Sequence, residues 1–455
     1  MNIFSVNPVN GEVIKKYRLD SNKAVFKKIG ETHAAWLKWK QTTFVQRAAL
    51  LNQMALVLDS QKAELAKLMA LEMGKPIKQG ITEIEKCASV CTYYAQNAES
   101  FLKDQTVKTE AAKSYVTFQP IGLVLAVMPW NFPFWQVFRF LAPALAAGNC
   151  GVLKHASNVP GCALAIEDIV KQAGFPDNVF QTLLISSAQV NKVIENPLIK
   201  AVTLTGSTKA GIQVAQKAGA LLKKTVLELG GSDAYIILED ADLEHAAETC
   251  VNSRLINNGQ SCIAAKRFIV VKTVEKEFTR LFLEKMKAKT MGDPLTDGTN
   301  VGPQARVDLR DELHKQVKKS VRMGAKCILG GVVPKDKSAF YPPTILTKVK
   351  KGMPAYHEEL FGPVATIIKA RDEAEAISIA NDSIFGLGGA IFTQNKVKGG
   401  FIAARLMEAG SCFVNTMVKS DPRLPFGGIK QSGYGRELGM FGIHEFVNIK
   451  TVYIA

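Results

Sequence analysis

One cysteine of the chain stands where a nucleophile would be useful. Cys262 follows the polar, glycine-containing segment 257–261 and precedes the apolar run 268–271, which predicts a β-strand. A thiol on a loop at the end of a rigid element can be reached by a substrate, and thiols are strong nucleophiles. Free cysteines are also often small buried hydrophobes. Cys262 by itself is therefore compatible with either catalysis or packing.

Two further residues could cooperate with such a thiol. Asn131 lies in the Pro-Trp-Asn-Phe-Pro segment 129–133, directly after a predicted strand, where ligands of parallel sheets usually bind. Its amide could stabilise an oxyanion, or it could stabilise a turn. Glu228 lies in an apolar run ahead of two glycines. Burial would raise the pKa of its carboxyl, as suits a general base, although a strand-end Glu could also pair with a surface Lys.

Two turns could hold a nucleotide. In the segment 205–211, Gly206 and Ser207 mark a strand-to-helix turn where phosphates could approach backbone N–H groups; an ordinary capped helix start would look the same. Glu359, in the segment 357–364, could bond to ribose hydroxyls, or it could belong to a solvated charged turn.

Composition narrows the class of protein. The 455 residues are 47% hydrophobic and 22% charged, as in ordinary globular proteins, with a net charge of +16. The lysines are scattered without interleaved aromatic residues, which disfavours nucleic-acid binding and favours anionic small ligands or a solvated basic surface. Eight dispersed cysteines and six histidines show neither a disulfide framework nor metal-ligand spacing, which indicates a cytoplasmic protein without a metal site.

We expect neither a signal peptide nor a membrane span. The first residues lack a basic region followed by an apolar one. The uncharged stretch 114–138 is interrupted by prolines, glycine and amides, which a spanning helix would not tolerate. It is better interpreted as a buried strand followed by an active-site loop.

The elements that must position these residues predict a doubly wound α/β sheet. The first hundred residues show mainly helical periodicity, with a helix cap near Ser21. Predicted strands are 123–128, 151–154, 179–184, 201–205, 224–229 and 234–238, with helices at 141–147, 161–173 and 210–222. A second set of strands is predicted at 268–271, 325–329, 344–346 and 365–369. The alternating segments 106–118 and 445–454 could pair with each other or with a second subunit.

Seven motifs, in order and spacing over nearly the whole chain, resemble the aldehyde dehydrogenase superfamily. They are 129–133, 153–154, 205–208, 227–231, 259–262, 359–363 and 425–428. The resemblance implies a Rossmann-like dinucleotide-binding domain (1–104 and 121–230), an α/β catalytic domain (231–430) and a small β oligomerisation arm (105–120 and 440–455). It also implies a homodimer or homotetramer.

The resemblance assigns roles to single residues. Cys262 would attack an aldehyde to give a thiohemiacetal and then a thioester. Asn131 and the Cys262 N–H would hold the oxyanion, and Glu228 would activate the hydrolytic water. The residues expected to bind the cofactor, NADP or NAD, are Pro129, Trp130, Lys154, Ser157, Gly206, Ser207, Gly211, Leu229, Glu359 and Phe361.

Within the superfamily, the chain is similar to the shorter bacterial succinate-semialdehyde dehydrogenases. Arg139, Ser420 and Phe426 match substrate-binding positions, and Arg139 would bind the distal carboxylate; alternatively, Arg139 pairs with a nearby acid. Glutarate semialdehyde or an uncharged aliphatic aldehyde are alternative substrates. A non-catalytic binding or structural role is the alternative outside this class, and the joint presence of thiol, amide and acid argues against it.

Three positions depart from relatives. Ile256 stands where some relatives carry another substrate-binding Arg, which predicts weaker carboxylate affinity. Ala264 stands where others have a second cysteine, so a vicinal-cysteine redox switch is absent. Ser157 stands where NAD-preferring members often have Glu. Without that acid a 2′-phosphate is not repelled and Lys154 could bind it, so we expect NADP to be accepted and NAD to be used as well.

Overall fold

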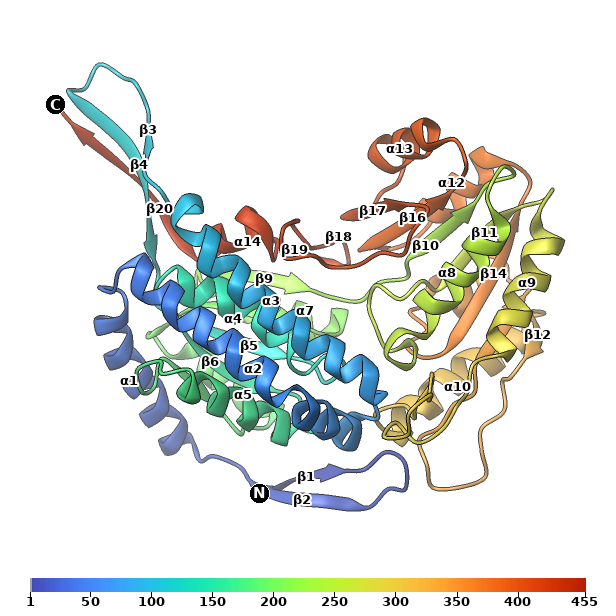
Figure 1. The fold of residues 1–455 in the computed structure, drawn as a ribbon, viewed down its shortest axis with the longest axis horizontal. Helices are drawn as coiled ribbons and strands as arrows, with labels where there is room; N and C mark the ends of the chain where they lie inside the picture. The colour runs from blue at the N-terminus through green and yellow to red at the C-terminus, as the bar shows by residue number, and fades with distance from the viewer. Residues whose placement is uncertain (1) are drawn as a thin grey trace.

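The computed structural model describes residues 2–455, which form two large β-sheets that lie side by side, each covered by helices (Figure 1). The first sheet has the order β19-β9-β8-β5-β6-β7, and all its neighbours are parallel except β19. Its strands are β5 Leu123–Met128, β6 Cys150–His155, β7 Phe180–Thr182, β8 Ile199–Thr205, β9 Lys224–Glu228 and β19 Gly433–Tyr434. The predicted strands of this sheet are thus confirmed, because near-continuous apolar runs are typical of parallel strands buried on both faces.

The helices around the first sheet come from the first half of the chain. They are α1 Asn22–Trp39, α2 Phe44–Met73, α3 Ile77–Phe101, α4 Trp135–Ala146, α5 Pro160–Gln172, η1 Ser187–Gln189, α6 Val190–Glu195 and α7 Thr208–Gly219. Ser21 caps α1 by accepting a hydrogen bond from the Ala24 N–H at 3.2 Å. The packed pair of α2 and α3 matters most for the site, because α3 lies against α4.

The second sheet has the order β12-β13-β14-β11-β10-β16-β17, with only β12 antiparallel to its neighbour. Its strands are β10 Ala234–Ile237, β11 Arg267–Val271, β12 Lys326–Leu329, β13 Thr344–Thr347, β14 Val364–Ala370, β16 Gly388–Phe392 and β17 Ser411–Val414. The prediction that 234–238 belongs to the first set of strands is wrong, since β10 pairs with β11 and β16.

Helices cover both faces of the second sheet and create two separate hydrophobic cores. They are α8 Leu243–Leu255, η2 Ile256–Gly259, α9 Glu275–Lys287, α10 Val307–Arg322, α11 Pro354–His357, α12 Glu373–Asn381 and α13 Lys396–Arg405. A further small sheet joins β15 Phe385–Gly386 to β18 Ile429–Lys430, and a hairpin is formed by β1 Asn2–Val6 and β2 Val13–Arg18.

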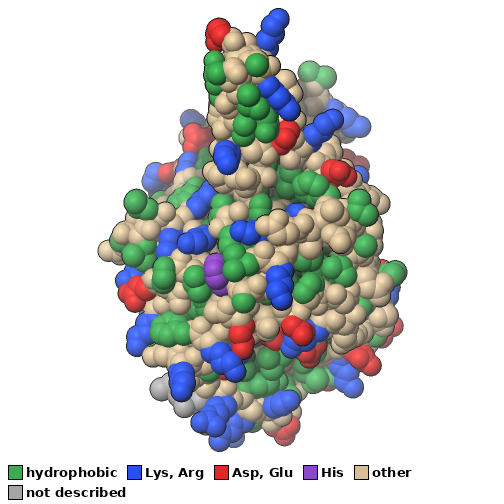
Figure 2. Space-filling view, turned by 90° about the vertical axis from the view of Figure 1, so that its left-hand side faces the viewer, with side chains coloured by type: hydrophobic (Ala, Val, Ile, Leu, Met, Phe, Trp, Pro, Cys, Tyr) green, Lys and Arg blue, Asp and Glu red, His purple; other side chains and the backbone are tan. Residues whose placement is uncertain are grey.

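An arm projects from the body and carries the C-terminus (Figure 1). It is the antiparallel sheet of β20 Val447–Ile454, β4 Lys113–Pro120 and β3 Gln105–Thr106, preceded by α14 Gly439–His444. The two alternating segments of the sequence therefore pair with each other. Apolar side chains of β20 are exposed, among them Ile449 and Tyr453, and Figure 2 shows hydrophobic side chains gathered on this projection.

The basic side chains are dispersed over the surface: Figure 2 shows Lys and Arg scattered over one whole face of the molecule. Across residues 2–455, no helix offers an apolar stretch long enough to cross a bilayer. In the same residues, no group of three or more His, Cys, Asp and Glu side chains is arranged to hold a metal ion.

Candidate active site

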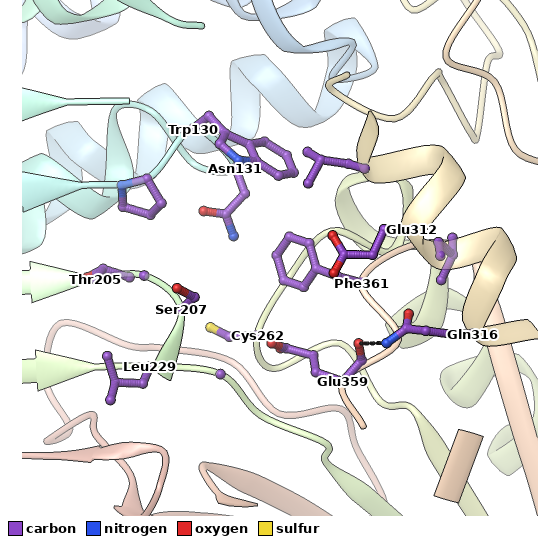
Figure 3. Close-up of a pocket in the computed structure, with 15 residues that line it drawn as sticks. Trp130, Asn131, Thr205, Ser207, Leu229, Cys262, Glu312, Gln316, Glu359 and Phe361 are labelled. Carbon is purple, nitrogen blue, oxygen red and sulfur yellow. Dashed lines mark hydrogen bonds between the residues drawn. The ribbon is translucent and has the colours of Figure 1, made fainter. Parts of the chain in front are cut away.

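A cavity of about 300 Å³ opens where the carboxyl ends of β5, β8 and β9 face the loop that carries Cys262. Figure 3 shows the Asn131 amide pointing toward the Cys262 sulfur across this space. The lining residues are Pro129, Trp130, Asn131, Thr205, Gly206, Ser207, Leu229, Gly230, Cys262, Leu309, Glu312, Leu313, Gln316, Glu359 and Phe361. Eight residues that the sequence motifs predicted for cofactor binding or catalysis thus share one cavity with Cys262. They are Pro129, Trp130, Asn131, Gly206, Ser207, Leu229, Glu359 and Phe361.

The loop before Cys262 is anchored to distant backbone. Asn258 donates to the carbonyls of Gly74 at 2.8 Å and Pro303 at 2.9 Å, and accepts from the Gly302 N–H at 2.7 Å. Gly259 has φ +74°, and a Cβ there would lie 2.3 Å from the carbonyl atoms of Gly362. The loop can approach the 359–363 segment this closely only with glycine at this position.

Asn131 is held by the same loop. Its Nδ2 donates to the Gln260 carbonyl at 3.0 Å, and its own carbonyl accepts from the Asn257 side chain. Asn257 adopts φ +52°, a left-handed conformation that Asn tolerates better than most residues. One amide hydrogen of Asn131 is used by Gln260, so the second remains for an oxyanion in the cavity.

The Cys262 thiol is protonated in the resting site. Burial raises its pKa to about 12, and the positive charges of Arg139 and Lys266 counteract part of this shift. Lys266 is itself held by the carbonyls of Ser261 at 2.9 Å and Cys262 at 2.8 Å. The thiol therefore needs a proton acceptor, or a stronger local positive charge, before it attacks.

Glu228 ends β9, is 2% exposed and finds no hydrogen-bond partner for either oxygen in residues 2–455. Burial, and then the nearby Glu437, raise the pKa of its carboxyl well above the ordinary value. Glu228 does not line the cavity; its Oε1 lies 2.8 Å from where a Cβ of Gly427 would be. Its carboxyl thus lies beside Gly427, outside the lining of the cavity, and burial favours the protonated form.

Glu359 is fixed on the opposite wall. Its Oε1 accepts from the Gly231 N–H at 3.0 Å and lies 3.5 Å from Lys266 Nζ. A Cβ on Gly230 would lie 2.7 Å from Oε2, so the glycine pair after Glu228 is needed for this approach. The carboxylate remains on the cavity wall, where ligand hydroxyls could donate to it.

The β8–α7 turn combines both interpretations of its sequence. Ser207 is the N-cap of α7 and accepts from the Ala210 N–H at 3.3 Å, while Gly206 and Ser207 also line the cavity. Gly211 lies on α7, and a Cβ there would lie 2.5 Å from Leu229. The helix therefore packs closely on the strand edge with its positive N-terminal end at the cavity.

Lys154 and Ser157 lie outside this cavity. Lys154, at the end of β6, lines a second hollow of about 660 Å³ between β8 and α7, and burial lowers the pKa of its ammonium. No carboxylate of residues 2–455 forms an ion pair with it. Ser157 is exposed and lines a third hollow beside the β1–β2 hairpin. Lys154 and Ser157 thus line two different hollows.

Arg139 is buried, with 2% exposure, and forms an ion pair with Glu437. It donates to Thr205 Oγ1 at 3.1 Å, and its guanidinium lies 5.0 Å from the centre of the Phe426 ring. Neither Arg139 nor Phe426 lines the cavity. The pairing with an acid, left open by the sequence, is therefore what the structure shows, and the role of Arg139 in binding a carboxylate stays a prediction.

Ser420 contacts a different cation, Lys86. Its Oγ accepts from Lys86 Nζ at 2.7 Å and from Trp135 Nε1 at 3.2 Å. Lys86 belongs to α3 and its ammonium lies 4.1 Å from the centre of the Trp135 ring. Sequence reasoning missed Lys86 because it is 334 positions from Ser420.

Four cavity residues on α10 were also missed: Leu309, Glu312, Leu313 and Gln316. Their spacing at i, i+3, i+4 and i+7 marks one helical face. That signal could have identified the helix and its buried face, but it could not show that this face closes the cavity of the other sheet.

The fold is a mixed α/β fold of the dehydrogenase type, and its cavity holds the Cys262 thiol. A model of the aldehyde dehydrogenase family matches residues 1–452. The chain belongs to the aldehyde dehydrogenase family.

Several relatives match the chain over its whole length. A probable succinate-semialdehyde dehydrogenase (NADP+) of Synechocystis sp. is 49% identical over 100% of both chains. A succinate-semialdehyde dehydrogenase (NADP+) of Mycobacterium avium is 48% identical over 100% of this chain and 97% of its own. The crystal structure of succinic semialdehyde dehydrogenase from Streptococcus pyogenes, in complex with NADP+ as the cofactor, is 38% identical with a TM-score of 0.97 over 99% of both chains.

Proposed function

We propose that this protein oxidises succinate semialdehyde to succinate with NADP, through a covalent intermediate on Cys262. The observation that carries the proposal is the single cavity in which the Cys262 thiol faces the Asn131 amide and the β8–α7 turn. Full-length relatives at 48–49% identity that are named for this reaction support the choice of substrate.

The first step joins Cys262 Sγ to the aldehyde carbon. The thiol proton passes to a water molecule, the S–C bond forms as the carbonyl π-bond opens, and the electron pair of that π-bond moves to the carbonyl oxygen of the thiohemiacetal. The second amide hydrogen of Asn131, together with the Cys262 N–H, donates to this oxygen. Because the loop before Cys262 is tied to the backbone by Asn258, these donors are in place before the substrate arrives.

The second step is the oxidation of that adduct. When bound, the nicotinamide supplies the acceptor for the hydride that leaves the thiohemiacetal carbon. The residues fit a dinucleotide. The Gly206 N–H donates to the Glu228 carbonyl and fixes the turn, so that Ser207 at the start of α7 can offer its N–H to a pyrophosphate. Glu359 presents a carboxylate to ribose hydroxyls. The rings of Trp130 and Phe361 meet edge to face with their centres 5.7 Å apart, and both rings line the cavity.

The third step releases the acid. A water attacks the thioester at Cys262 while Glu228 accepts its proton, so that succinate leaves and the thiol is restored. Glu228 turns from its place beside Gly427 toward the cavity for this step. Its raised pKa makes it a strong enough base near neutral pH once it is ionised.

We expect NADP to be preferred because Lys154 can bind its 2′-phosphate. Lys154 is a buried cation without a paired carboxylate, in a hollow next to α7. Ser157 adds no carboxylate that would repel a 2′-phosphate, so NADP is accepted; NAD, which lacks this phosphate, is used as well. We expect a higher kcat/KM with NADP than with NAD, and Ser157→Glu should reduce the value with NADP roughly tenfold or more by adding repulsion. Equal or better kcat/KM with NAD in the wild type would contradict the preference.

The test of the main proposal is NAD(P)H absorbance with a panel of aldehydes. Succinate semialdehyde should give the highest kcat/KM, ahead of glutarate semialdehyde and butanal. Cys262→Ala should lose activity by a factor of about 10⁴ or more, because the hydroxyls of Thr205 and Ser207, which also line the cavity, are much weaker nucleophiles than a thiol. A variant as active as the wild type would disprove the covalent mechanism, and equal rates with butanal would disprove the substrate.

We also propose that the ranges 1–104 and 121–230 bind the dinucleotide, that 231–430 form the catalytic domain, and that the arm joins subunits into a homodimer or homotetramer. Exposed apolar side chains on the open face of β20 support this role of the arm. Eight cysteines without a disulfide support a cytoplasmic location. Light scattering coupled to gel filtration measures the assembly; a monomer at micromolar concentration would contradict it.

A further inference from the structure

Lys86 is a half-buried cation beside the predicted substrate residues. It projects from α3, packs its ammonium against the Trp135 ring at 4.1 Å and donates to Ser420 Oγ at 2.7 Å. The Ser420 hydroxyl already accepts from both Lys86 and Trp135 Nε1. Its own hydrogen is therefore free to donate in a third direction.

The neighbouring acids are all committed elsewhere. Glu83 pairs with Lys75 and accepts the N–H groups of Phe134 and Trp135 at the start of α4. Glu85 pairs with Lys62 at 2.7 Å. Asp421 pairs with Arg423 at 2.7 Å. Among residues 2–455, Lys86 thus has no carboxylate partner.

The other cation of this region is in the opposite state. Arg139 is neutralised by Glu437, is fully enclosed and also binds Thr205. An incoming carboxylate would have to displace Glu437 and leave it buried without a partner, which is costly. Lys86 requires no such exchange.

Lys86 and the Cys262 thiol share one close neighbour, Arg139. Trp135 and Arg139 are one helical turn apart on α4, and the loop that carries Asn131 leads directly into this helix. Arg139 is close enough to Cys262 to lower the pKa of the thiol, and close enough to Lys86 to lower the pKa of its ammonium. Arg139 on α4 therefore lies within electrostatic range of both the thiol and Lys86.

We propose that Lys86, together with the free hydrogen of Ser420, binds the distal carboxylate of the substrate and so determines specificity. This rests on the proposed function, since it assumes an aldehyde with an anionic far end. The carboxylate would accept a charge-assisted bond from Lys86 and a second bond from Ser420. Lys86 then does the work that an Arg at position 256 would do in some relatives.

The experiment compares succinate semialdehyde with butanal, which has a similar chain and no charge. Lys86→Met should raise KM for succinate semialdehyde roughly 10- to 100-fold with little change in kcat, and change KM for butanal less than about threefold. Lys86→Arg should keep KM for the semialdehyde near the wild-type value. Lys78→Met, on the same helix but largely exposed, is the matched control and should change neither substrate.

Each other outcome has a definite meaning. An unchanged KM for succinate semialdehyde in Lys86→Met, or equal increases for both aldehydes, would overturn the role of Lys86 and leave the proposed function standing. A wild type that prefers butanal would overturn the proposed function and the role of Lys86 with it. If Lys86→Met does not fold by circular dichroism, Lys86→Gln replaces it, and the same comparison decides.

Discussion

Two neighbouring regions of the molecule are held together by different means. Around Cys262, the loop 257–262 is fixed through backbone contacts: Asn258 bonds to the carbonyls of Gly74 and Pro303, and Gly259 lies directly against Gly362. Beside α4, side chains form two groups: Lys86 contacts Trp135 and Ser420, and Arg139 pairs with Glu437. We call these five side chains the α4 cluster.

This difference indicates which positions can be substituted without loss of the reaction. The contacts of this loop need the Asn258 side chain and the absence of a Cβ at Gly259, so we expect these two positions to tolerate few substitutions. A cluster of side chains can be altered one member at a time, and each change shifts the charge that a substrate meets. We infer that the reaction is determined by the first region and the choice of aldehyde by the second.

Apart from the loss of the Cys262 thiol, the largest effect expected at the reaction centre is that of Glu228→Gln. The amide keeps the shape of the side chain but cannot accept the proton of water, so hydrolysis of the thioester should slow by roughly 10²- to 10⁴-fold. Acylation should persist. Rapid mixing should therefore show a burst of NADPH close to one per active site, followed by slow turnover; loss of the burst would show that Glu228 also serves the first step.

Arg139→Met tests whether Arg139 stabilises the fold or binds the substrate. It leaves Glu437 buried without its partner, which should lower the free energy of unfolding by about 3–5 kcal/mol. Arg280→Met removes an exposed arginine paired with Glu277 and Glu284, and should change the free energy of unfolding far less. Urea unfolding measures both.

The double variant Arg139→Met/Glu437→Gln isolates the pair. Removing the stranded charge should restore part of the stability lost in Arg139→Met. A stable Arg139→Met whose KM rises for succinate semialdehyde and not for butanal would instead support the role that the sequence predicted for Arg139.

Much of the fold and the centre of the site could be predicted from sequence, for identifiable reasons. The strands around Asn131 and Glu228 are apolar runs between glycine and proline turns, and local pattern is sufficient to find them. β16 and β17 were missed because Gly388–Phe392 opens with two glycines and Ser411–Val414 is short. Neither has the length or the alternation that a strand usually shows.

The α4 cluster could not be predicted, because its contacts join distant parts of the chain. Lys86 and Ser420 are 334 positions apart, and nothing near Arg139 in the sequence indicates Glu437 as its partner. Glu228 shows the same limit, since its identity was predicted but its orientation toward Gly427 depends on the packing of a separate segment.

Gly259→Ala tests the claim that backbone approach fixes the reaction centre. A Cβ at this position would lie 2.3 Å from Gly362, in addition to the strain of a non-glycine residue at φ +74°. We expect a loss of about 1–3 kcal/mol in unfolding free energy and a lower kcat, because the Cys262 loop must shift. Gly298→Ala has φ +89° with open space around it, so it carries the backbone strain without the contact. Equal effects of the two variants on kcat would contradict the claim.

The smallest effect expected concerns the charge of Lys86. Burial, and then Arg139, lower the pKa of its ammonium to about 8, while Cys87, Glu83 and Asp421 act in the opposite direction. The ammonium is charged below that pH and neutral above it, so affinity for an anionic aldehyde is present at low pH and lost as the pH rises through 8. The ratio of kcat/KM for succinate semialdehyde to that for butanal should fall about tenfold between roughly pH 7 and pH 9. Ionisation of Cys262 affects both aldehydes and cancels in this ratio.

Lys86→Arg should remove that decline, because a guanidinium stays charged throughout this range. The ratio would then remain level to about pH 9, because the arginine stays charged and still binds the carboxylate. A variant that keeps the wild-type decline would mean that another group titrates, and would assign the choice of substrate to a part of the α4 cluster other than Lys86. A level ratio in the variant with a falling ratio in the wild type can only arise from the residue that was exchanged, since every other charge of the cluster is the same in both.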